Sequence, residues 1–329
     1  MKQLCFWIVC VCLATSLVGQ DIRVDVQLRQ VVATVTDAEG RFVTNLRPED
    51  FVVSVDGVPQ TVSHLVSGAD SPVTLGLLLD TSCSVWSTLP SAVEAVRTFI
   101  NSMRPSDEAF LMTFADGTSL LQDFTRDSTS LLRAVDAIRS TDGGTRLVSA
   151  LMTAVDKTRQ GSNRKRALIV VSDGGEKVAN SGLDKLRSRL NASEILIYTV
   201  QTPYTENVLK PPRPASPRPN GITTRSQREA KVEAARKSTQ PEYMTPDELT
   251  KFRAAIAEMN RWSAELMKTI VEGSGGRHFS LDVQSPGDVF AAISAELRGQ
   301  YTLGFYPGPK LKAGKISIRT VNPAYRVRS

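Results

Sequence analysis

The chain has 329 residues, 41% of them hydrophobic and 22% charged, so it is long and apolar enough to bury one large or two ordinary cores, which excludes a wholly disordered protein. The formal net charge is +6 at pH 7, and residues 210–240 account for this excess, with eight Lys or Arg against two Glu. Because this stretch is rich in proline and lacks stacking aromatics, we expect a solvated loop and no specific nucleic-acid partner, although weak attachment to acidic polymers stays open.

Residues 1–19 show the pattern of a secretory signal peptide, with Lys2, an apolar run and small residues up to Gly19. An uncleaved membrane anchor is the alternative, but the apolar run is short for a membrane span. Cleavage near Gln20 would leave Cys83 as the one cysteine of the mature chain, so no intramolecular disulfide could form. We expect a secreted or periplasmic protein with no transmembrane helix after signal removal.

Residues 21–69 predict a small Ig-like β module. Alternating residues at 22–28 and 31–36 indicate strands, and the runs 51–55 and 60–65 flank Asp56-Gly57, a strong hairpin signal. These strands are too few to close a sandwich. We therefore expect the last two strands, at 301–306 and 316–321, to pair with this module, as part of a C-terminal segment 284–329 that begins with a helix.

Residues 71–283 alternate between strands and helices, which predicts a mostly parallel sheet with helices on both faces. Strands are expected at 74–79, 109–114, 166–172 and 194–200, with a short edge strand near 120–124 and a last strand at 275–281. Helices are expected at 89–103, 128–138, 145–159, 182–190, 245–273 and 286–297. A Pro-rich, charged insertion at 203–245 interrupts the pattern, and we expect residues 203–241 to be mobile. The predicted fold class is α/β, a doubly wound sheet with a small β-sandwich-like module.

The apolar run Leu75–Leu79 ends abruptly in Asp80-Thr81-Ser82-Cys83-Ser84. A buried strand that ends in this way brings one carboxylate and two hydroxyls, at a spacing of two, to the edge of the sheet. Such hard oxygen ligands suit Mg²⁺, Ca²⁺ or Mn²⁺ better than zinc or copper. An ordinary Ser-rich turn after a strand is the alternative interpretation.

Together with Gly143-Gly144-Thr145 and Ser172-Asp173-Gly174, this motif resembles the metal-ion-dependent adhesion site (MIDAS) of von Willebrand factor A-type domains. The flanking stretches 273–277 and 300–307 resemble a secreted bacterial family related to these domains. The resemblance implies a divalent cation, with Mg²⁺ first and Mn²⁺ or Ca²⁺ as alternatives, and a protein partner that presents Asp or Glu. It also implies the ligand set Asp80, Ser82, Ser84, Thr145 and Asp173, whereas we expect Cys83 to be a packing or loop residue.

We expect that this protein is not an enzyme. Phosphoryl transfer through an aspartate would need a second acid where Ser82 stands, and the sequence has neither a G-x-S-x-G elbow nor a Walker-type phosphate loop. His64 and His278 are the only histidines, and neither is near the ligand set in the sequence. The sequence therefore offers little support for a Ser-His-Asp hydrolase, which needs a histidine base beside its serine. Two alternatives to metal-dependent protein binding remain. The first is a structural scaffold of an envelope complex that binds no metal, and the second, less favoured, is a Mg²⁺-dependent hydrolase.

Overall fold

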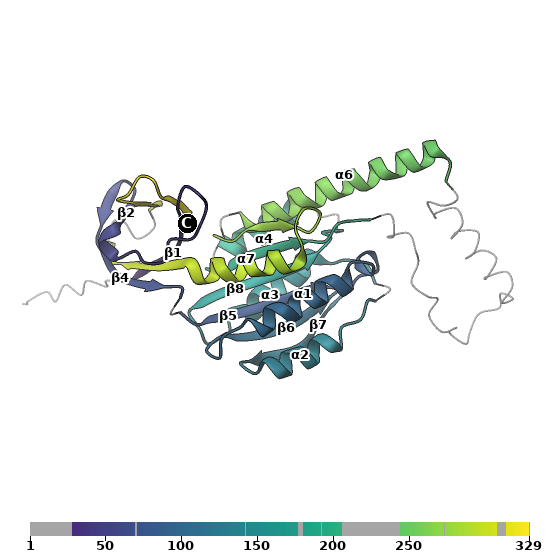
Figure 1. Cartoon of the computed structure of the whole chain (residues 1–329), viewed down its shortest axis with the longest axis horizontal. Coiled ribbons are helices and arrows are strands. Elements are labelled where there is room, and N and C mark those ends of the chain that lie inside the picture. Colours follow the sequence, from purple (N-terminus) through teal and green to yellow (C-terminus); the bar gives the residue numbers. More distant parts are fainter. Residues whose placement is uncertain are drawn as a thin grey trace, which may run out of the picture.

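The computed structural model describes residues 28–69, 71–141, 143–176, 180–191, 193–205, 244–272, 274–307 and 314–328. The predicted signal peptide, the strand expected at 22–28 apart from its last residue, and most of the insertion at 203–245 lie outside these residues. The described chain forms an α/β part and a small β module, which lie at opposite ends of the long axis (Figure 1). No helix in the described ranges combines the length and the apolar character needed to cross a membrane.

The α/β part is built on a six-stranded sheet with the order β10-β9-β8-β5-β6-β7. All pairings are parallel except that of β7 with β6, which is antiparallel and forms one edge. The strands are β5 (Val73–Asp80), β6 (Glu108–Phe114), β7 (Thr118–Thr125), β8 (Lys165–Ser172), β9 (Leu196–Gln201) and β10 (His278–Ser280). Every residue of β5 is buried, as expected for a central strand that is covered on both faces.

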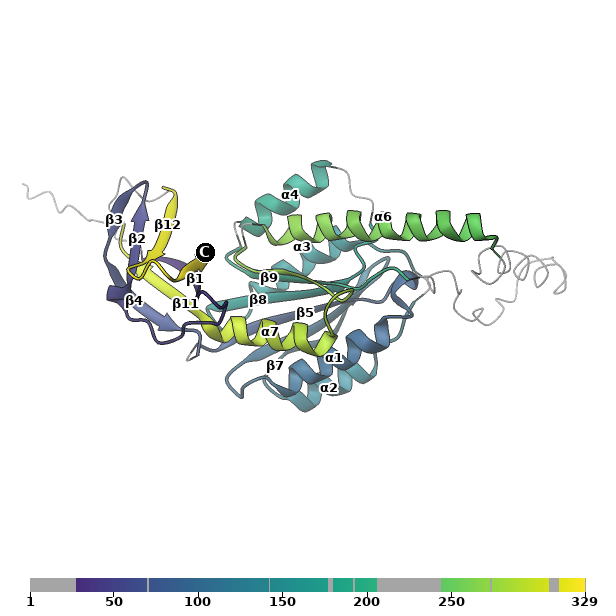
Figure 2. The same cartoon turned by 45° about the horizontal axis from the view of Figure 1, so that its top comes forward.

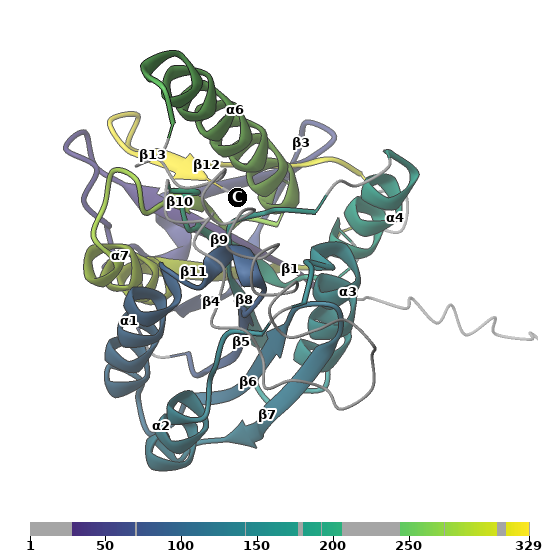
Figure 3. The same cartoon turned by 90° about the vertical axis from the view of Figure 1, so that its right-hand side faces the viewer.

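In the described part of the chain, helices cover both faces of this sheet, with α1, α2 and α7 on one and α3, α4 and α6 on the other (Figure 3). One core packs α1 (Leu89–Asn101), α2 (Ser128–Asp136) and α7 (Pro286–Gly299) against Leu75, Leu77 and Leu79 of β5. The other packs α3 (Leu147–Thr158), α4 (Asn180–Asn191) and α6 (Pro246–Val271) against Leu78. The alternate residues of β5 therefore face two separate cores, and the doubly wound class predicted from the sequence is confirmed.

Helix α6 begins where its sequence predicts. The Thr245 hydroxyl accepts a hydrogen bond from the Glu248 amide, the Glu248 carboxylate accepts one from the Thr245 amide, and Pro246 takes the first helical position. The N-terminal part of α6 projects beyond the rest of the α/β part (Figure 2). Only its C-terminal third, from Ser263 to Ile270, supplies buried residues.

The β module consists of two small sheets to which both ends of the described chain contribute. One has the order β13-β1-β11-β4 and the other β12-β2-β3. The N-terminal strands are β1 (Arg29–Thr36), β2 (Phe51–Val55), β3 (Val58–Gln60) and β4 (Val62–Ser67), and the C-terminal ones are β11 (Gln300–Phe305), β12 (Ile316–Thr320) and β13 (Arg326–Arg328). The predicted pairing of the last strands with the N-terminal ones is present in the structure, with β11 between β1 and β4 and with β12 beside β2.

The module differs from the sequence expectation in two places. The strand expected at 60–65 is broken at Thr61, because β3 forms a hairpin with β2 whereas β4 pairs with β11 in the other sheet. Alternation indicates which side of a strand is apolar, but it does not reveal the sheet to which the strand belongs. Strand β13 has only three residues and no apolar alternation, so nothing in the sequence indicated it. The hairpin turn is as predicted, with positive φ at both Asp56 (49°) and Gly57 (80°).

The chain passes between the two parts twice, from β4 to β5 through residues 68–72, and from α7 to β11 with no residue between, since α7 ends at Gly299 and β11 starts at Gln300. The Lys165 ammonium of β8 also donates a hydrogen bond to the Leu297 carbonyl at this junction. A helix of the α/β core therefore leads directly into a middle strand of the β module.

Candidate functional site

The predicted ligand residues lie where the connection of the sheet changes direction. Asp80 is the last residue of β5, and Asp173 directly follows β8, which is the neighbouring parallel strand. From β5 the chain continues to β6 on one side, whereas β8 lies on the other side. Loops that leave two such strands diverge at their carboxyl ends, and this is where open α/β sheets bind ligands.

Asp80 is held by hydrogen bonds to both carboxylate oxygens and is only 3% exposed. Its Oδ1 accepts from the Ser82 amide at 2.9 Å, and its Oδ2 accepts from the Ser172 hydroxyl. The Ser172 oxygen in turn accepts from the Gly174 amide at 3.0 Å. Ser172 thus links the loop after β5 to the loop after β8, a role that sequence reasoning missed, although its position directly before Asp173 was a usable signal.

The loop after β5 turns into a short 3-10 segment, η2 (Cys83–Val85). The Ser82 and Ser84 hydroxyl oxygens lie 3.2 Å apart, so these two predicted ligands come together. The Cys83 side chain is exposed and its amide donates to the Gly143 carbonyl at 3.2 Å. Of the two roles expected for Cys83, a packing or a loop residue, the structure shows the loop residue, because η2 leaves its side chain exposed.

The loop that carries Thr145 is attached to the site through its backbone. The Thr141 amide donates to the Thr81 carbonyl at 2.7 Å, and the Gly144 amide donates to Asp116 Oδ1 at 2.8 Å. A Cβ atom on Gly143 would lie 2.8 Å from Asp116 Oδ2, so a side chain there would displace the Asp116 carboxylate that accepts from the Gly144 amide. Thr145 itself is half-buried, and among the described residues its hydroxyl makes no hydrogen bond to the other four predicted ligands.

Asp173 is 1% exposed, and its Oδ1 accepts from the Gly175 amide at 2.9 Å. Within the described chain its Oδ2 is buried and has no hydrogen-bond partner. Burial raises the pKa of Asp173, and the nearby hydroxyls of Ser84 and Tyr204 oppose this only in part. Burial also raises the pKa of Asp80, and the charge of Asp173 raises it further. Each carboxylate therefore disfavours ionisation of the other unless a cation lies between them.

Helix α6 supports the Asp173 loop from the side, through contacts that the sequence did not indicate. The Ser263 hydroxyl donates to the Asp173 carbonyl. The Asn260 side chain accepts from the Tyr204 amide at 2.8 Å and donates to the Tyr204 carbonyl at 3.1 Å. The buried Tyr204 hydroxyl lies beside Asp173, whose negative charge, after burial, raises the Tyr204 pKa. These pairs are 56 and 90 residues apart in the chain, which is why spacing alone could not reveal them.

The side chains present fit a hard divalent cation. Two buried carboxylates repel one another, and one buried carboxylate oxygen has no partner in the described chain. The Ser82 and Ser84 hydroxyls lie together on the loop after β5, and Thr145 lies on the loop before α3. No cluster of three His, Cys, Asp or Glu occurs among the described residues, so a metal here would depend on hydroxyl and water ligands beside Asp80 and Asp173. Mg²⁺ accepts such a set, because it usually keeps several waters and takes one or two carboxylates.

A family comparison agrees with this geometry. Residues 75–176 match the family model of the von Willebrand factor type A domain, a range that includes all five predicted ligands. No curated protein sequence matches the chain.

Several solved structures resemble the fold at low identity. An aerotolerance-related membrane protein from Bacteroides fragilis is 16% identical, with 68% of this chain and 98% of that chain covered and a TM-score of 0.45. BatB from Bacteroides thetaiotaomicron is 16% identical, with 68% and 97% covered and a TM-score of 0.45. A von Willebrand factor type A protein from Catenulispora acidiphila is 11% identical, with 92% and 64% covered and a TM-score of 0.46. None of these structures bears on function.

Proposed function

Because residues 75–176 match the family model of the von Willebrand factor type A domain, and such domains are generally protein-interaction modules, we propose that this chain is a metal-dependent protein-binding module. A divalent cation, with Mg²⁺ as the first candidate, is held by Asp80, Ser82, Ser84, Thr145 and Asp173. The cation accepts the carboxylate of an Asp or Glu on a protein partner. The same proposal places the protein outside the cytoplasm, secreted or periplasmic, on the pattern of residues 1–19.

The observation that carries this proposal is the buried Asp173 Oδ2, which has no partner in the described chain and lies next to a second buried carboxylate. Two ionised carboxylates in one buried site are unfavourable, so ionisation of both at neutral pH requires a positive charge beside them. A divalent cation supplies that charge and offers an open position to an incoming carboxylate.

The residues of this chain have separate tasks in the proposed mechanism. Ser172 and the Ser82 amide hold Asp80 in place, and the Gly175 amide holds Asp173. The hydroxyls of Ser82 and Ser84 supply neutral ligands, so the set carries only two negative charges. A cation that is neutralised by two carboxylates and no more retains attraction for a third carboxylate, and this favours an acidic partner.

Binding is favoured over hydrolysis by the location of the histidines. His64 lies on β4 in the β module, and His278 lies on β10, where its ring nitrogen is 3.1 Å from the Thr199 hydroxyl. Neither contacts Asp80 or Asp173 among the described residues, so no histidine base accompanies the two carboxylates.

Thermal unfolding tests the metal assignment. For a ligand that binds only the folded state, a concentration 100 times Kd stabilises by about 2.7 kcal/mol. At roughly 2–4 °C per kcal/mol this raises Tm by about 5–10 °C. We expect Mg²⁺ or Mn²⁺ to produce this rise in the wild type and in the exposed control Asp282→Asn, and to have no effect on Asp80→Ala. An equal rise in Asp80→Ala would reject the assignment.

A second experiment tests whether a protein partner binds through the metal. Proteins retained by the immobilised chain should be released by EDTA and should not be retained by Asp80→Ala. Retention that is equal with EDTA and in Asp80→Ala would favour the scaffold without metal instead.

A further inference from the structure

A cavity of about 330 Å³ lies at the junction of the β module and the α/β part. None of the five predicted metal ligands lines it. Residues of β1 and β13 form its wall in the module, and the α/β part contributes Arg277, directly before β10, and Glu296 of α7. Three arginines, Arg277, Arg326 and Arg328, line the cavity together with a single carboxylate, Glu296. The lining therefore has two positive charges in excess.

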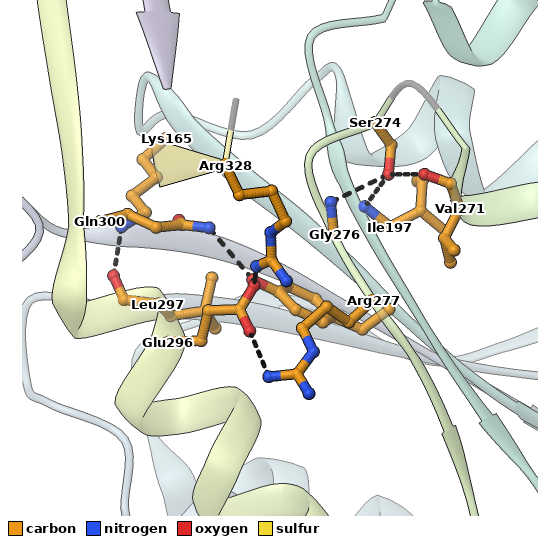
Figure 4. A network of polar contacts seen from close by, with 11 residues as sticks. Lys165, Ile197, Val271, Ser274, Gly276, Arg277, Glu296, Leu297, Gln300 and Arg328 are labelled. Carbon is orange, nitrogen blue, oxygen red and sulfur yellow. Dashed lines mark hydrogen bonds and ion pairs between the residues drawn. The ribbon is translucent and has the colours of Figure 1, made fainter. Parts of the chain in front are cut away.

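Glu296 is fully buried, and its carboxylate is surrounded by donors (Figure 4). Arg328 Nη2 pairs with Oε1, and Arg277 Nη1 lies 3.4 Å from Oε2. The Tyr198 hydroxyl donates to Oε1 at 3.2 Å and accepts from Gln300 Nε2 at 3.2 Å. The two guanidinium groups thus reach one carboxylate from separate segments of the chain, Arg277 from directly before β10 and Arg328 from β13.

One carboxylate cannot neutralise two guanidinium groups. Within the described chain Arg328 Nε is buried and has no hydrogen-bond partner. Burial lowers the pKa of Arg328, and the neighbouring charge of Arg277 adds to this lowering. The side chains of Arg277 and Arg328 remain 46% and 39% exposed, so both are accessible from the cavity. An anion between them would relieve their repulsion.

The remaining lining indicates the kind of anion. Phe42 and Val327 give the cavity an apolar wall, and Thr34 and Thr36 add two hydroxyl-bearing side chains. The volume is at the lower end of the range for small-molecule sites, and it exceeds the space that a single ion needs. The planar guanidinium fork matches the oxygens of a carboxylate or a phosphate.

We propose that this cavity binds a small organic molecule through an oxyanion group, a carboxylate or a phosphate, held by Arg277, Arg326 and Arg328. The ligand contacts β1 and β13 on one side and α7 on the other, so its binding stabilises the junction of the two parts. The site lies at the module end of the molecule, whereas Asp80 and Asp173 stand at the carboxyl ends of β5 and β8.

The test uses the purified protein and four probes: benzoate, phenyl phosphate, inorganic phosphate and the neutral analogue benzamide. Ionic strength is kept constant with NaCl, because general screening also affects exposed arginines. We expect benzoate or phenyl phosphate to bind saturably in calorimetry and to raise Tm, and benzamide to do neither. A response to benzoate alone identifies a carboxylate ligand, and a response to phenyl phosphate alone identifies a phosphate. Inorganic phosphate should bind more weakly than phenyl phosphate, since it lacks the apolar group.

Variants connect the binding to the cavity. Arg277→Gln and Arg328→Gln should weaken binding at least tenfold, whereas Arg319→Gln, an exposed arginine of β12 outside the cavity, should not change it. Because Arg328→Gln could loosen β13, Arg326→Gln provides a second variant, one that is exposed and not paired with Glu296 in the described chain. It should weaken binding severalfold and leave the ligand-free Tm unchanged.

The proposal is overturned if no probe binds saturably, if benzamide binds as tightly as benzoate, or if Arg277→Gln and Arg326→Gln both bind like the wild type. Asp80→Ala should bind these probes as the wild type does. The outcome is therefore independent of the metal assignment.

Discussion

The Ser172 hydroxyl connects two loops that are 92 residues apart in the chain. It donates to Asp80 and accepts from the Gly174 amide, so one buried oxygen fixes both carboxylate loops of the candidate site. At the scale of single residues, the site therefore depends on a side chain that is not among the five predicted ligands.

Replacement of Ser172 by Ala tests this connection. The change leaves the buried Gly174 amide and one Asp80 oxygen without their partner, and an unsatisfied buried group costs about 1–3 kcal/mol. We expect a loss of this size in urea unfolding and a weaker stabilisation by Mg²⁺. The exposed serine of α4 in the control Ser188→Ala should give almost no change. Unaltered stability and an unaltered Mg²⁺ response in Ser172→Ala would contradict the role given to Ser172.

His278 gives a separate prediction for pH. Burial lowers its pKa to about 4, whereas an unfolded histidine titrates near 6.5. Between these values the unfolded chain binds a proton that the folded chain does not, so this residue's contribution to stability is complete above pH 6.5 and is lost as the pH falls toward 4.

We therefore expect the free energy of unfolding to fall more between pH 7 and pH 5 in the wild type than in His278→Gln, which retains a partner for Thr199. The difference between the two proteins cancels the titration of Asp80 and Asp173. Parallel pH profiles for the two proteins in urea unfolding would show that His278 is not responsible.

At the scale of elements, Gly76 of the central strand β5 allows side chains of β6, of β8 and of the end of α3 to pack close to the strand. Gly76 is the one interruption in its apolar run, and a Cβ atom there would lie 2.7 Å from Leu168 Cδ1 and 2.7 Å from Phe110 Cζ. The Thr158 hydroxyl, at the end of α3, would lie 2.9 Å away. The space that a side chain would fill is already taken by a packed core.

The substitution Gly76→Ala should consequently destabilise the fold by about 1–3 kcal/mol through overpacking. Gly117 is a suitable control, because an added Cβ there meets nothing within 4 Å. Urea unfolding of Gly76→Ala and Gly117→Ala measures the difference. Equal midpoints for the two variants would disprove tight packing at Gly76.

Sequence alone predicted most of the α/β elements, because each has a regular spacing of apolar residues and is bounded by turn or cap residues. The apolar run before Asp80 and the run before Asp173 both end at the same edge of the sheet, so the two carboxylates could be placed together from the chain. Asp116 and Tyr204 could not be predicted as supporting residues, since they act through segments distant in sequence. The position of Ser172 directly before Asp173 was a usable signal, but it did not reveal that the Ser172 hydroxyl bonds to Asp80. The split of β3 from β4 was also not predictable, because it depends on a partner strand near the C-terminus.

At the scale of the whole molecule, the continuous passage from α7 to β11 joins the α/β part to the β module. The candidate metal site lies at the carboxyl edge of the sheet, and the arginine-lined cavity lies at the module junction. A protein partner and a small anion would therefore be bound at separate places on one molecule.

The most direct test of the central claim is calorimetric titration of the metal-free protein with Mg²⁺ and Mn²⁺, in the wild type, Asp80→Ala, Asp173→Ala and the control Asp282→Asn. We predict one saturable site per chain in the wild type and in Asp282→Asn, and none in the two other variants. No saturable binding by the wild type, or equal binding by Asp80→Ala and Asp173→Ala, would contradict a cation held by these residues.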